Sequence, residues 1–330
     1  MNEQEILARW EADKPMYRAW AQFIAQEINR RLELAIDPTP LDYFLKVPMV
    51  PRLKADTSLI DKALYRSKPY KNPYEDITDK VGMRYVVLLT THINTLCSII
   101  ENAECEVFWA QAKDKDYEED RLAKPLEFSY QSVHYVLRSK AGLSINGVNI
   151  PENLACEVQI RTLLQHAHSE LTHDTLYKPK TTAKPSVKRT VAKSMALIEA
   201  TDEFFEQAMR DLASASEPQR LLLDYLSEAY SKGIGMDPGQ ERSNQIVIDA
   251  FIELLPHDAP ARIEEFLTAK PYVFDRIKEQ KGQRYFFKQP AVLLAYFLAE
   301  KMPAQTREQW PIDSGDLAKV FSDLGKKFEG

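Results

Sequence analysis

The chain has 330 residues, and its 43 basic and 49 acidic side chains give a net charge of −6 at pH 7. That length accommodates two domains with separate cores, and the acidic balance excludes a nucleic-acid-binding surface spread over the whole protein, so any basic patch must be local. The three scattered cysteines argue against a disulfide framework, no apolar run approaches the ~20 residues of a membrane helix, and no signal peptide is visible. We therefore expect a cytoplasmic protein without a membrane partner.

A long helix is expected over residues 3–36, because large apolar residues recur near helical spacing until Asp37–Pro40 ends the pattern. A strand is expected next, from about Tyr43 to Lys54, although Pro48 and Pro51 interrupt it.

Basic side chains lie along this strand and in the short helix after it, for which Asp56 or Thr57 is the expected N-cap. Strand alternation and one helical turn would bring together Arg52, Lys54, Ser58 and Lys62. Taken alone, such a group is typical of a solvated basic surface.

Asp79 lies in the segment Asp76–Arg84, which leads into a strongly apolar strand, Tyr85–Leu89. Taken alone, an aspartate before a strand is typical of a turn or a cap. The elements expected after it are a helix over 93–102, a strand over 105–110 and a solvated loop over the mixed-charge run Asp114–Arg121.

Tyr130, Ser132 and His134 alternate onto one face of a further strand, with apolar residues on the opposite face. A tyrosine in this position is also typical of ordinary strand packing. The pair Asn146-Gly147 predicts the turn of a hairpin over about 141–151.

The stretch Leu154–Lys178 is the most informative part of the chain. Glu157, Gln159 and Arg161 alternate with β-branched residues, which predicts a strand with three polar groups on one face. Thr162 is the expected N-cap of a helix that follows at once. A strand with apolar groups on both faces would be usual in a β–α unit, so this one is expected to line a polar site.

Six cationic residues then follow without an intervening acid: Lys178, Lys180, Lys184, Lys188, Arg189 and Lys193. They indicate either the solvated start of a helix over about 186–213 or a contact with a nucleic-acid backbone.

Strand signals end at about Ser214–Pro218, and we place a domain boundary near residue 215. The segment 216–330 is expected to be an all-helical domain whose many aromatic side chains form its core. Helical periodicity recurs over 219–231, 243–254, 259–268, 271–280, 289–302 and 315–328.

Several motifs in chain order together resemble a known family. They are Arg52-x-Lys54, Asp79-x-x-Gly82-x-Arg84, Tyr130-x-Ser132-x-His134, Glu157-x-Gln159-x-Arg161-Thr162 and, at the end of the helix that follows, His173, Tyr177 and Lys178. The conjunction closely resembles the synthetase domain of the RelA/SpoT family, over about residues 40–180. It implies an α+β fold for residues 1–215, with a mixed central β-sheet flanked by helices as in nucleotidyltransferases, followed by the small all-α domain.

Members of that family transfer pyrophosphate from ATP to a ribose 3′-hydroxyl, and the resemblance assigns roles to individual residues. Asp79 and Glu157 would share one Mg²⁺, and Glu157 would also accept the proton of the attacking hydroxyl. ATP would be bound by Arg52, Lys54, Ser58, Lys62 and Arg84. The acceptor would be bound by Tyr130, Ser132, His134, Gln159 and Arg161.

The family divides over the acceptor, which is either GDP or GTP, giving (p)ppGpp alarmones, or the 3′-terminal adenosine of tRNA. Ser129 stands where the family usually has glycine, and together with the cationic run and the fused helical domain it favours tRNA. The nucleic-acid contacts would be Lys178, Lys180, Lys184, Lys188 and Arg189. The fused domain resembles the antitoxin part of CapRel-type toxin–antitoxin proteins, which restrains the toxin until a phage protein relieves it.

A catalytically dead nucleotide sensor is a third interpretation, disfavoured because the charged residues of the motifs are all present. His92 stands where the family often has an acid, which leaves that position without an assigned role. The histidines at 166, 168 and 173 lack the i, i+4 spacing of a zincin helix and are not expected to bind a metal. Only about 40 residues precede the motifs, so no hydrolase domain is expected.

Overall fold

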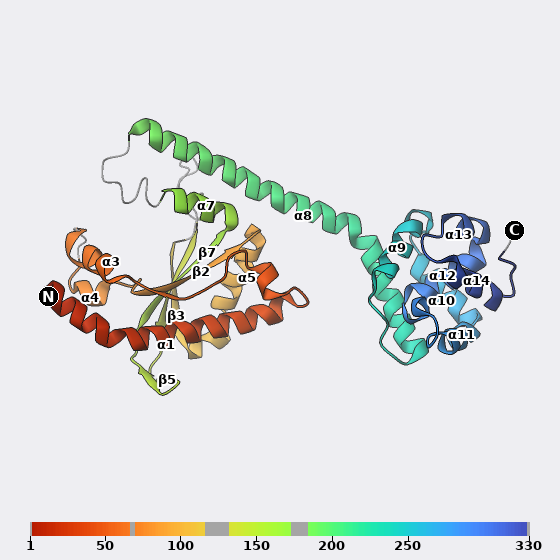
Figure 1. Cartoon of the computed structure of the whole chain (residues 1–330), viewed down its shortest axis with the longest axis horizontal. Coiled ribbons are helices and arrows are strands. Elements are labelled where there is room, and N and C mark those ends of the chain that lie inside the picture. The colour runs from red at the N-terminus through yellow and green to blue at the C-terminus, as the bar shows by residue number, and fades with distance from the viewer. Residues whose placement is uncertain (1, 67–69, 116–131, 173–183, 329–330) are drawn as a thin grey trace. The chain divides into compact units, whose positions relative to one another are not determined.

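The computed structural model describes residues 2–66, 70–115, 132–172 and 184–328. They form two compact units, residues 1–208 and 209–330, and the division falls inside helix α8 (Pro185–Ile234). The first unit contains a mixed β-sheet flanked by helices, and the second is helical (Figure 1). The expected fold class is therefore confirmed.

Within the described residues, the main sheet of the first unit has five strands in the order β1-β2-β7-β4-β3. Their bounds are β1 Arg52–Leu53, β2 Val81–Val87, β7 Ala155–Thr162, β4 Val133–Ser139 and β3 Trp109–Lys115. The β2–β7 pair is parallel and the other pairs are antiparallel. The two parallel strands are central, so side chains on both of them share one face of the sheet.

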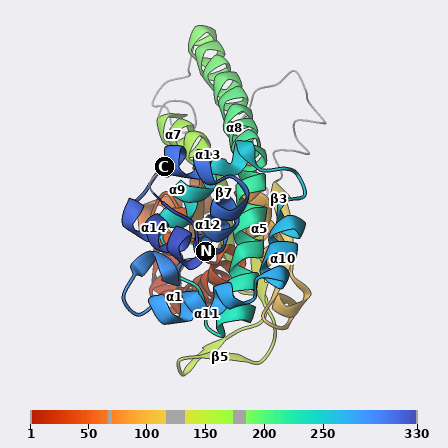
Figure 2. The ribbon, with the colours of Figure 1, turned by 90° about the vertical axis from the view of Figure 1, so that its right-hand side faces the viewer.

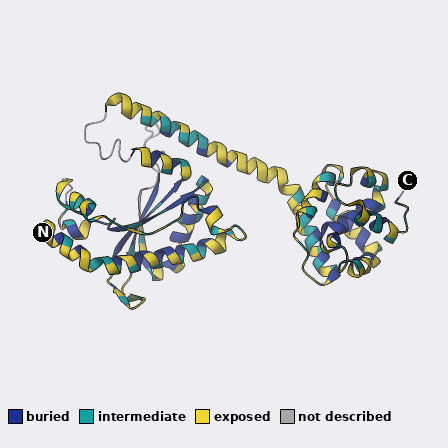
Figure 3. Cartoon of the chain, viewed as in Figure 1, coloured by how far each residue is buried: buried dark blue, intermediate teal, exposed yellow. Residues whose placement is uncertain are grey.

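Helices α1 (Glu3–Ile36) and α5 (Thr90–Ile100) pack against each other and against β2 and β7, on the apolar face of the sheet. Val158 and Ile160 of β7 are fully buried in that core, as their alternation predicts. Figure 3 shows buried residues along the central strands of this unit. The polar residues between them consequently project from the opposite face.

The junction between β7 and α7 (Leu163–Thr172) is fixed by a capping box. The hydroxyl of Thr162 accepts a hydrogen bond from the Gln165 amide nitrogen at 3.2 Å, and the Gln165 side-chain oxygen accepts one from the Thr162 amide at 3.0 Å. The expected N-cap role of Thr162 is confirmed.

The hairpin predicted over 141–151 is also confirmed, as β5 (Leu143–Ile145) and β6 (Val148–Ile150). Asn146 and Gly147 both adopt positive φ, 49° and 80°, as the tight turn of a two-residue hairpin requires. In both ribbon views the hairpin extends past α1 (Figures 1 and 2).

The strand expected from Tyr43 to Lys54 is wrong except for β1. The segment begins as a helix, α2 (Leu41–Phe44), and is otherwise irregular, because Pro48 and Pro51 have no N–H to donate to a ladder. The helix after it is α3 (Asp56–Ile60), with Ala55 rather than Asp56 or Thr57 at its N-cap, and it continues as a π-helix, η1 (Asp61–Tyr65).

Further boundaries differ from expectation. The strand expected at 105–110 is mostly a 3₁₀ turn, η2 (Ala103–Val107), which starts where the Asn102 side chain accepts a hydrogen bond from the Glu104 amide at 2.8 Å. Asp114 belongs to β3 instead of a loop, and residues 116–121 lie outside the described part of the chain. A short helix, α4 (Pro73–Asp76), precedes β2.

Separate helices were expected over about 186–213 and 219–231, but α8 continues through Pro218 as one helix. One proline removes a single N–H, and the segments on both sides are rich in good helix formers. The C-terminal part of α8 belongs to the second unit, where Leu222, Leu226 and Tyr230 are buried in the hydrophobic core.

Helix α12 (Ala291–Lys301) lies at the centre of the second unit, and nine residues of this helix are buried. Neither α13 nor η5 was expected from the sequence. The other elements are α9 (Arg242–Phe251), η4 (Ile252–Leu254), α10 (Ala259–Ala269), α11 (Tyr272–Gln280), η5 (Tyr285–Lys288), α13 (Pro303–Gln309) and α14 (Ser314–Asp323). Among the described helices of the chain, none has the combined length and apolar character needed to cross a bilayer.

Candidate active site

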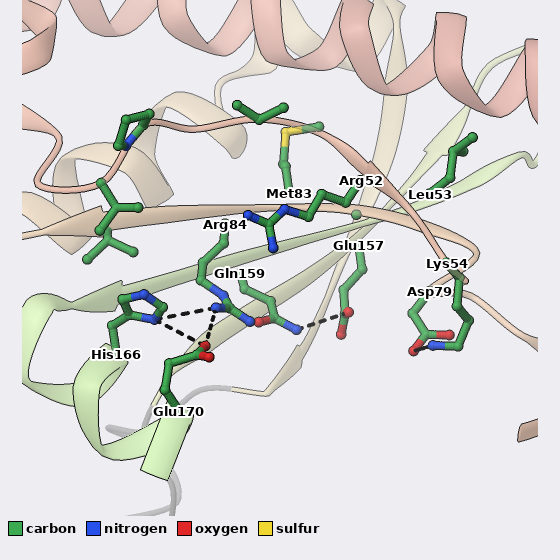
Figure 4. A pocket seen from close by; sticks show the side chains of 15 residues that line it. Arg52, Leu53, Lys54, Asp79, Met83, Arg84, Glu157, Gln159, His166 and Glu170 are labelled. Carbon is green, nitrogen blue, oxygen red and sulfur yellow. Dashed lines mark hydrogen bonds and ion pairs between the residues drawn. The ribbon is translucent and has the colours of Figure 1, made fainter. Parts of the chain in front are cut away.

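A cavity of about 470 Å³ opens on the polar face of the sheet, between β1, β2, β7 and α7 (Figure 4). Six residues singled out from the sequence line it: Arg52, Lys54, Asp79, Arg84, Glu157 and Gln159. They come from three separate segments of the chain, 52–54, 79–84 and 157–159, which the fold brings together.

Asp79 is the centre of a cationic cluster at one end of the cavity. Its Oδ2 atom lies 2.7 Å from the Lys54 ammonium and 2.9 Å from that of Lys62. Burial alone would raise the pKa of Asp79, but the charges of the two lysines and their hydrogen bonds outweigh it and hold the pKa below its ordinary value. Asp79 is therefore ionised, and the two ammonium groups converge on it.

Glu157 lies beside this cluster and is held by different groups. Its Oε1 atom is 3.2 Å from His134 Nδ1, and its Oε2 atom accepts a hydrogen bond from the Gln159 amide at 3.1 Å. Burial and the Asp79 charge act to raise the pKa of Glu157, whereas His134 and Gln159 lower it, and the net pKa is below the ordinary value.

The hydrogen bonds at Glu157 extend in both directions along the polar face. The Ser132 hydroxyl lies 2.5 Å from His134 Nε2, and the buried Arg161 guanidinium donates to the side-chain oxygen of Gln159. Every described member of the predicted acceptor group therefore belongs to one hydrogen-bonded row centred on Glu157.

Gly82 allows the paired strands β2 and β7 to approach each other. It pairs with Glu157 in the parallel β2–β7 ladder, and a Cβ atom at this position would lie only 3.0 Å from the Glu157 carbonyl oxygen. The close approach of the β7 backbone therefore explains why the Asp-x-x-Gly-x-Arg motif has glycine at this position.

The other end of the cavity contains a cluster that the sequence did not predict. Arg84 donates to Glu170 Oε1 at 2.8 Å and lies 3.4 Å from His166 Nδ1. Burial and the neighbouring Arg84 charge lower the pKa of His166. His166 and Glu170 are one turn apart on α7, and this i, i+4 spacing immediately after the polar strand was the available signal.

Lys80 is a second residue that the sequence did not indicate. It is buried, and its ammonium donates to the carbonyls of Tyr74 at 2.6 Å and Ile77 at 2.7 Å. Burial lowers the pKa of Lys80 to about 8. These two hydrogen bonds from Lys80 stabilise the turn before β2 and so hold the backbone next to Asp79 in position.

Other predicted residues lie outside the cavity wall or outside the described chain. Ser58 does not line the cavity, and Lys62 reaches it through Asp79. Exposed positions at the start of α8 are occupied by Lys184, Lys188 and Arg189. The predicted residues Tyr130, His173, Tyr177, Lys178 and Lys180 lie outside the described residues. His92 packs its ring 4.4 Å from that of Phe44.

The two carboxylates fit a magnesium ion better than a metal with protein ligands alone. Within the described ranges, no group of three or more histidine, cysteine, aspartate or glutamate side chains could hold a metal. Asp79 Oδ1 is nevertheless buried without a hydrogen-bond partner in this part of the chain, which leaves an anionic oxygen available. Mg²⁺ usually takes one or two carboxylates together with substrate phosphates, and this donor set matches that habit.

Comparisons with known proteins agree with this geometry. Residues 51–182 match the model of a family described as a region found in RelA/SpoT proteins. Small alarmone synthetase 1 from Bacillus subtilis has a similar fold, at 18% identity and a TM-score of 0.50, over 63% of this chain and 99% of that one.

Two further solved structures are similar at a lower score. Small alarmone synthetase 2 from Bacillus subtilis has 17% identity and a TM-score of 0.49, over 61% of this chain and 99% of that one. A GTP pyrophosphokinase family protein from Streptococcus pneumoniae has 20% identity and a TM-score of 0.48, over 62% and 94%. A comparison with curated proteins finds no match to this sequence.

The cavity combines two carboxylates with several cations on the polar face of the sheet. The match of residues 51–182 to the region found in RelA/SpoT proteins makes the class more specific, because it supports a pyrophosphotransferase of the RelA/SpoT type.

Proposed function

We propose that the first unit transfers the β,γ-pyrophosphate of ATP to a ribose 3′-hydroxyl. The observation that carries this proposal is that Asp79 and Glu157, which are 78 positions apart in the sequence, line one cavity together with Arg52 and Lys54. A cavity with two ionised acids beside converging cations suits a substrate that brings both phosphate charge and a divalent ion.

The cationic end of the cavity would bind the triphosphate. In phosphoryl transfer the protein contributes mainly positioning and neutralisation of charge between the oxygens in flight. Lys54 and Lys62 are already gathered on Asp79, and Arg52 lines the same cavity with its guanidinium directed toward Arg84 (Figure 4). Arg84, farther along the cavity, has the planar group that can stack on the ATP base.

A magnesium ion would be held by Asp79 and Glu157. When bound, it would neutralise charge on the phosphates and so favour the departure of AMP. The contacts of Lys54 and Lys62 with Asp79, and of His134 with Glu157, support this assignment.

Glu157 is the base that we assign to the reaction. Its lowered pKa keeps it ionised, and an ionised carboxylate within reach of the 3′-hydroxyl can accept its proton. Gln159 and His134 hold the two carboxylate oxygens, and Arg161 in turn holds Gln159. We assign orientation of the acceptor to Ser132 and to this row of side chains, with Tyr130 as a stacking platform for the acceptor base.

For the acceptor we propose the 3′-terminal adenosine of tRNA, which would make the enzyme an inhibitor of translation. Ser129 in place of glycine supports this, as does the cationic run around Lys184, Lys188 and Arg189, whose described members are exposed. Exposed cations of this kind bind nucleic-acid backbones by releasing counterions.

A guanine nucleotide is the second candidate acceptor. Small alarmone synthetase 1 of Bacillus subtilis has the same fold, and its name describes synthesis of alarmones. On this alternative the enzyme would convert GDP or GTP to (p)ppGpp, and the cationic run would have no role in acceptor binding.

Labelling separates the two acceptors. Purified protein is incubated with γ-labelled ATP and with tRNA, GDP or GTP, and the products are resolved by thin-layer and gel analysis. Label in tRNA that is lost in Lys184→Glu/Lys188→Glu supports the first proposal. The matched control is Lys278→Glu/Lys327→Glu, which reverses two exposed lysines of the second unit. Label only in guanine nucleotides refutes the tRNA proposal.

We propose further that residues 216–330 restrain the first unit, with a phage protein as the trigger that relieves the restraint. The support is the resemblance of a helical domain fused after the synthetase to CapRel-type proteins. Truncation after residue 215 should raise pyrophosphate transfer by the remaining soluble protein. Loss of solubility or activity would instead show that the second unit supports the first.

A further inference from the structure

We propose that Asp202 and Glu206 of α8 are positioning residues for pyrophosphate transfer, because they hold the ends of the two strands that form the active site. This inference rests on the proposed function of the first unit. Both acids belong to that unit and are buried, with 3% and 5% of their surface exposed. Neither residue lines the cavity or belongs to any motif of the sequence.

Asp202 is bonded to the residue that ends β7. The Thr162 hydroxyl, fully buried, donates to Asp202 Oδ2 at 2.9 Å. The same hydroxyl accepts the capping hydrogen bond from Gln165 that starts α7. Asp202 thus fixes the orientation of the Thr162 side chain at the junction between strand and helix.

Glu206 is bonded to the segment that follows β2. Its Oε1 atom accepts hydrogen bonds from the Thr90 hydroxyl at 2.8 Å and from the Thr91 amide at 2.6 Å. These groups form the first turn of α5, where the unpaired N–H groups and the positive end of the helix dipole favour an anion.

The two contacts lie at one edge of the sheet. Strands β2 and β7 are parallel and paired through Val87 and Thr162, so their carboxyl ends lie side by side. Asp202 and Glu206 are four residues apart and therefore project from the same face of α8. One helix consequently holds both strand ends in a fixed register.

The register of these strands sets the geometry of the active site. Thr162 directly follows Arg161, which donates to Gln159, which donates to Glu157. A shift of the strand end would pass along this row to the carboxylate that we assign as the base. A second contact, 3.3 Å between His168 Nε2 and the Val191 carbonyl, holds α7 against α8.

Burying two carboxylates is costly unless their hydrogen bonds are specific, whereas apolar side chains would seal a helix against a sheet edge more cheaply. The geometry therefore favours positioning over packing alone. Helix α8 continues into the second unit. A change in the packing of α8 against the sheet edge would therefore alter the position of Glu157, and the second unit could influence the active site in this way.

The test uses the full chain and four variants: Asp202→Ala, Asp202→Asn, Thr162→Val and the double variant Asp202→Ala/Thr162→Val. Glu203→Gln, an exposed acid on the same helix, is the matched control. Pyrophosphate transfer, KM for ATP and thermal unfolding are measured for each. Asp202→Ala should lower kcat about 10- to 100-fold, since a small misplacement of a catalytic group has effects of that size.

The pattern among the variants separates positioning from packing. In Asp202→Ala, KM for ATP should stay within about twofold, because the residues that we assign to the phosphates are not in contact with Asp202. Asp202→Asn should recover most of kcat, because its amide oxygen can still accept a hydrogen bond from Thr162. The double variant should lose less than the two single losses combined, since both changes break the Asp202–Thr162 contact and only Thr162→Val also removes the cap on Gln165. Should Asp202→Ala fail to fold, the nearly isosteric Thr162→Val supplies the same comparison.

Three outcomes would overturn the inference: kcat of Asp202→Ala equal to that of Glu203→Gln, additive losses in the double variant, or a kcat loss fully explained by unfolding. A wild-type protein that is inactive both as the full chain and after truncation at residue 215 would instead refute the proposed function. In that event amide hydrogen exchange over residues 157–162 decides the inference, which fails if Asp202→Ala leaves that exchange unchanged.

Discussion

The two carboxylates of the cavity, Asp79 and Glu157, have the same charge state but opposite surroundings. Asp79 is held by the ammonium groups of Lys54 and Lys62, whereas Glu157 is held by an amide and an imidazole. One acid therefore stabilises a cluster of cations, and the other is oriented without being neutralised by a lysine. The contrast suggests that Asp79 organises the phosphate grip and that Glu157 carries the proton transfer.

The largest effect is expected for Glu157→Gln, which would sharpen this contrast. The change keeps the shape of the side chain and an oxygen that can accept from Gln159, but it removes the anion that takes the proton. General bases contribute about 10²–10⁴-fold, so kcat should fall by about 10³-fold. Thermal unfolding should change little, because no buried cation loses its partner.

The measurement is steady-state pyrophosphate transfer beside a thermal melt of the same preparation. A Glu157→Gln protein that retains wild-type turnover would remove Glu157 from the chemistry. It would also restore the interpretation of the domain as a nucleotide-binding module whose effect requires no catalysis.

Asp79→Asn should show the opposite division between activity and stability. Lys54 and Lys62, with 17% and 15% of their side chains exposed, would lose their common anion. Hydrogen bonds to charged groups contribute about 1.5–3 kcal/mol, so the free energy of unfolding should fall by about 2 kcal/mol. kcat/KM for ATP should fall about 100-fold, measured by initial rates at varied ATP and magnesium. A stability equal to that of Glu157→Gln would contradict the contrast.

The pH dependence of that stability difference has a definite sign. The folded state lowers the pKa of Asp79, so the carboxylate stabilises the fold fully above its ordinary pKa of 3.8 and loses the effect as pH falls through the lower, folded value. Urea unfolding of wild type and Asp79→Asn should therefore differ most near neutral pH and converge in acid.

Strands β7 and β1 show how far the sequence alone could predict this site. In β7, regular alternation of polar and β-branched residues determines which side chains face the cavity, and Glu157, Gln159 and Arg161 lie where the pattern predicts. In β1 only Arg52 and Leu53 form the strand, because the surrounding prolines prevent a longer ladder. Arg52 of β1 and Lys54 directly after it still line the cavity. Their place in the motif therefore predicted the site although the predicted strand was mostly wrong.

Other parts of the site depend on contacts between distant segments, for which the sequence has no periodic signal. The meeting of Lys62 with Asp79, the buried Lys80 under the turn, and Asp202 at the end of β7 are examples. In each case a polar residue contacts a segment that only the tertiary fold brings close to it. The sequence predicts separate helices over 186–213 and 219–231, whereas α8 continues through Pro218 because the flanking segments are rich in helix formers.

Glu170→Gln should have the smallest effect, and it tests the far end of the cavity. The Arg84–Glu170 pair is 38% and 61% exposed, and exposed pairs contribute about 0–1 kcal/mol, so stability should change by less than about 1 kcal/mol. The change also removes a negative charge from the cavity wall and releases Arg84. If Arg84 stacks on the ATP base, it must leave Glu170 to do so, and KM for ATP should fall about threefold, in line with a weak exposed pair.

Glu75→Gln is the matched control, because the Arg9–Glu75 pair is comparably exposed, at 42% and 51%, and neither residue lines the cavity. Both variants should melt close to the wild type, and only Glu170→Gln should change KM for ATP. A rise in KM for ATP in Glu170→Gln would mean that Glu170 contacts the nucleotide directly instead of competing for Arg84. Equal KM values in both variants would place the ATP base away from this end, so that the apolar residues near β1 would become its candidate neighbours.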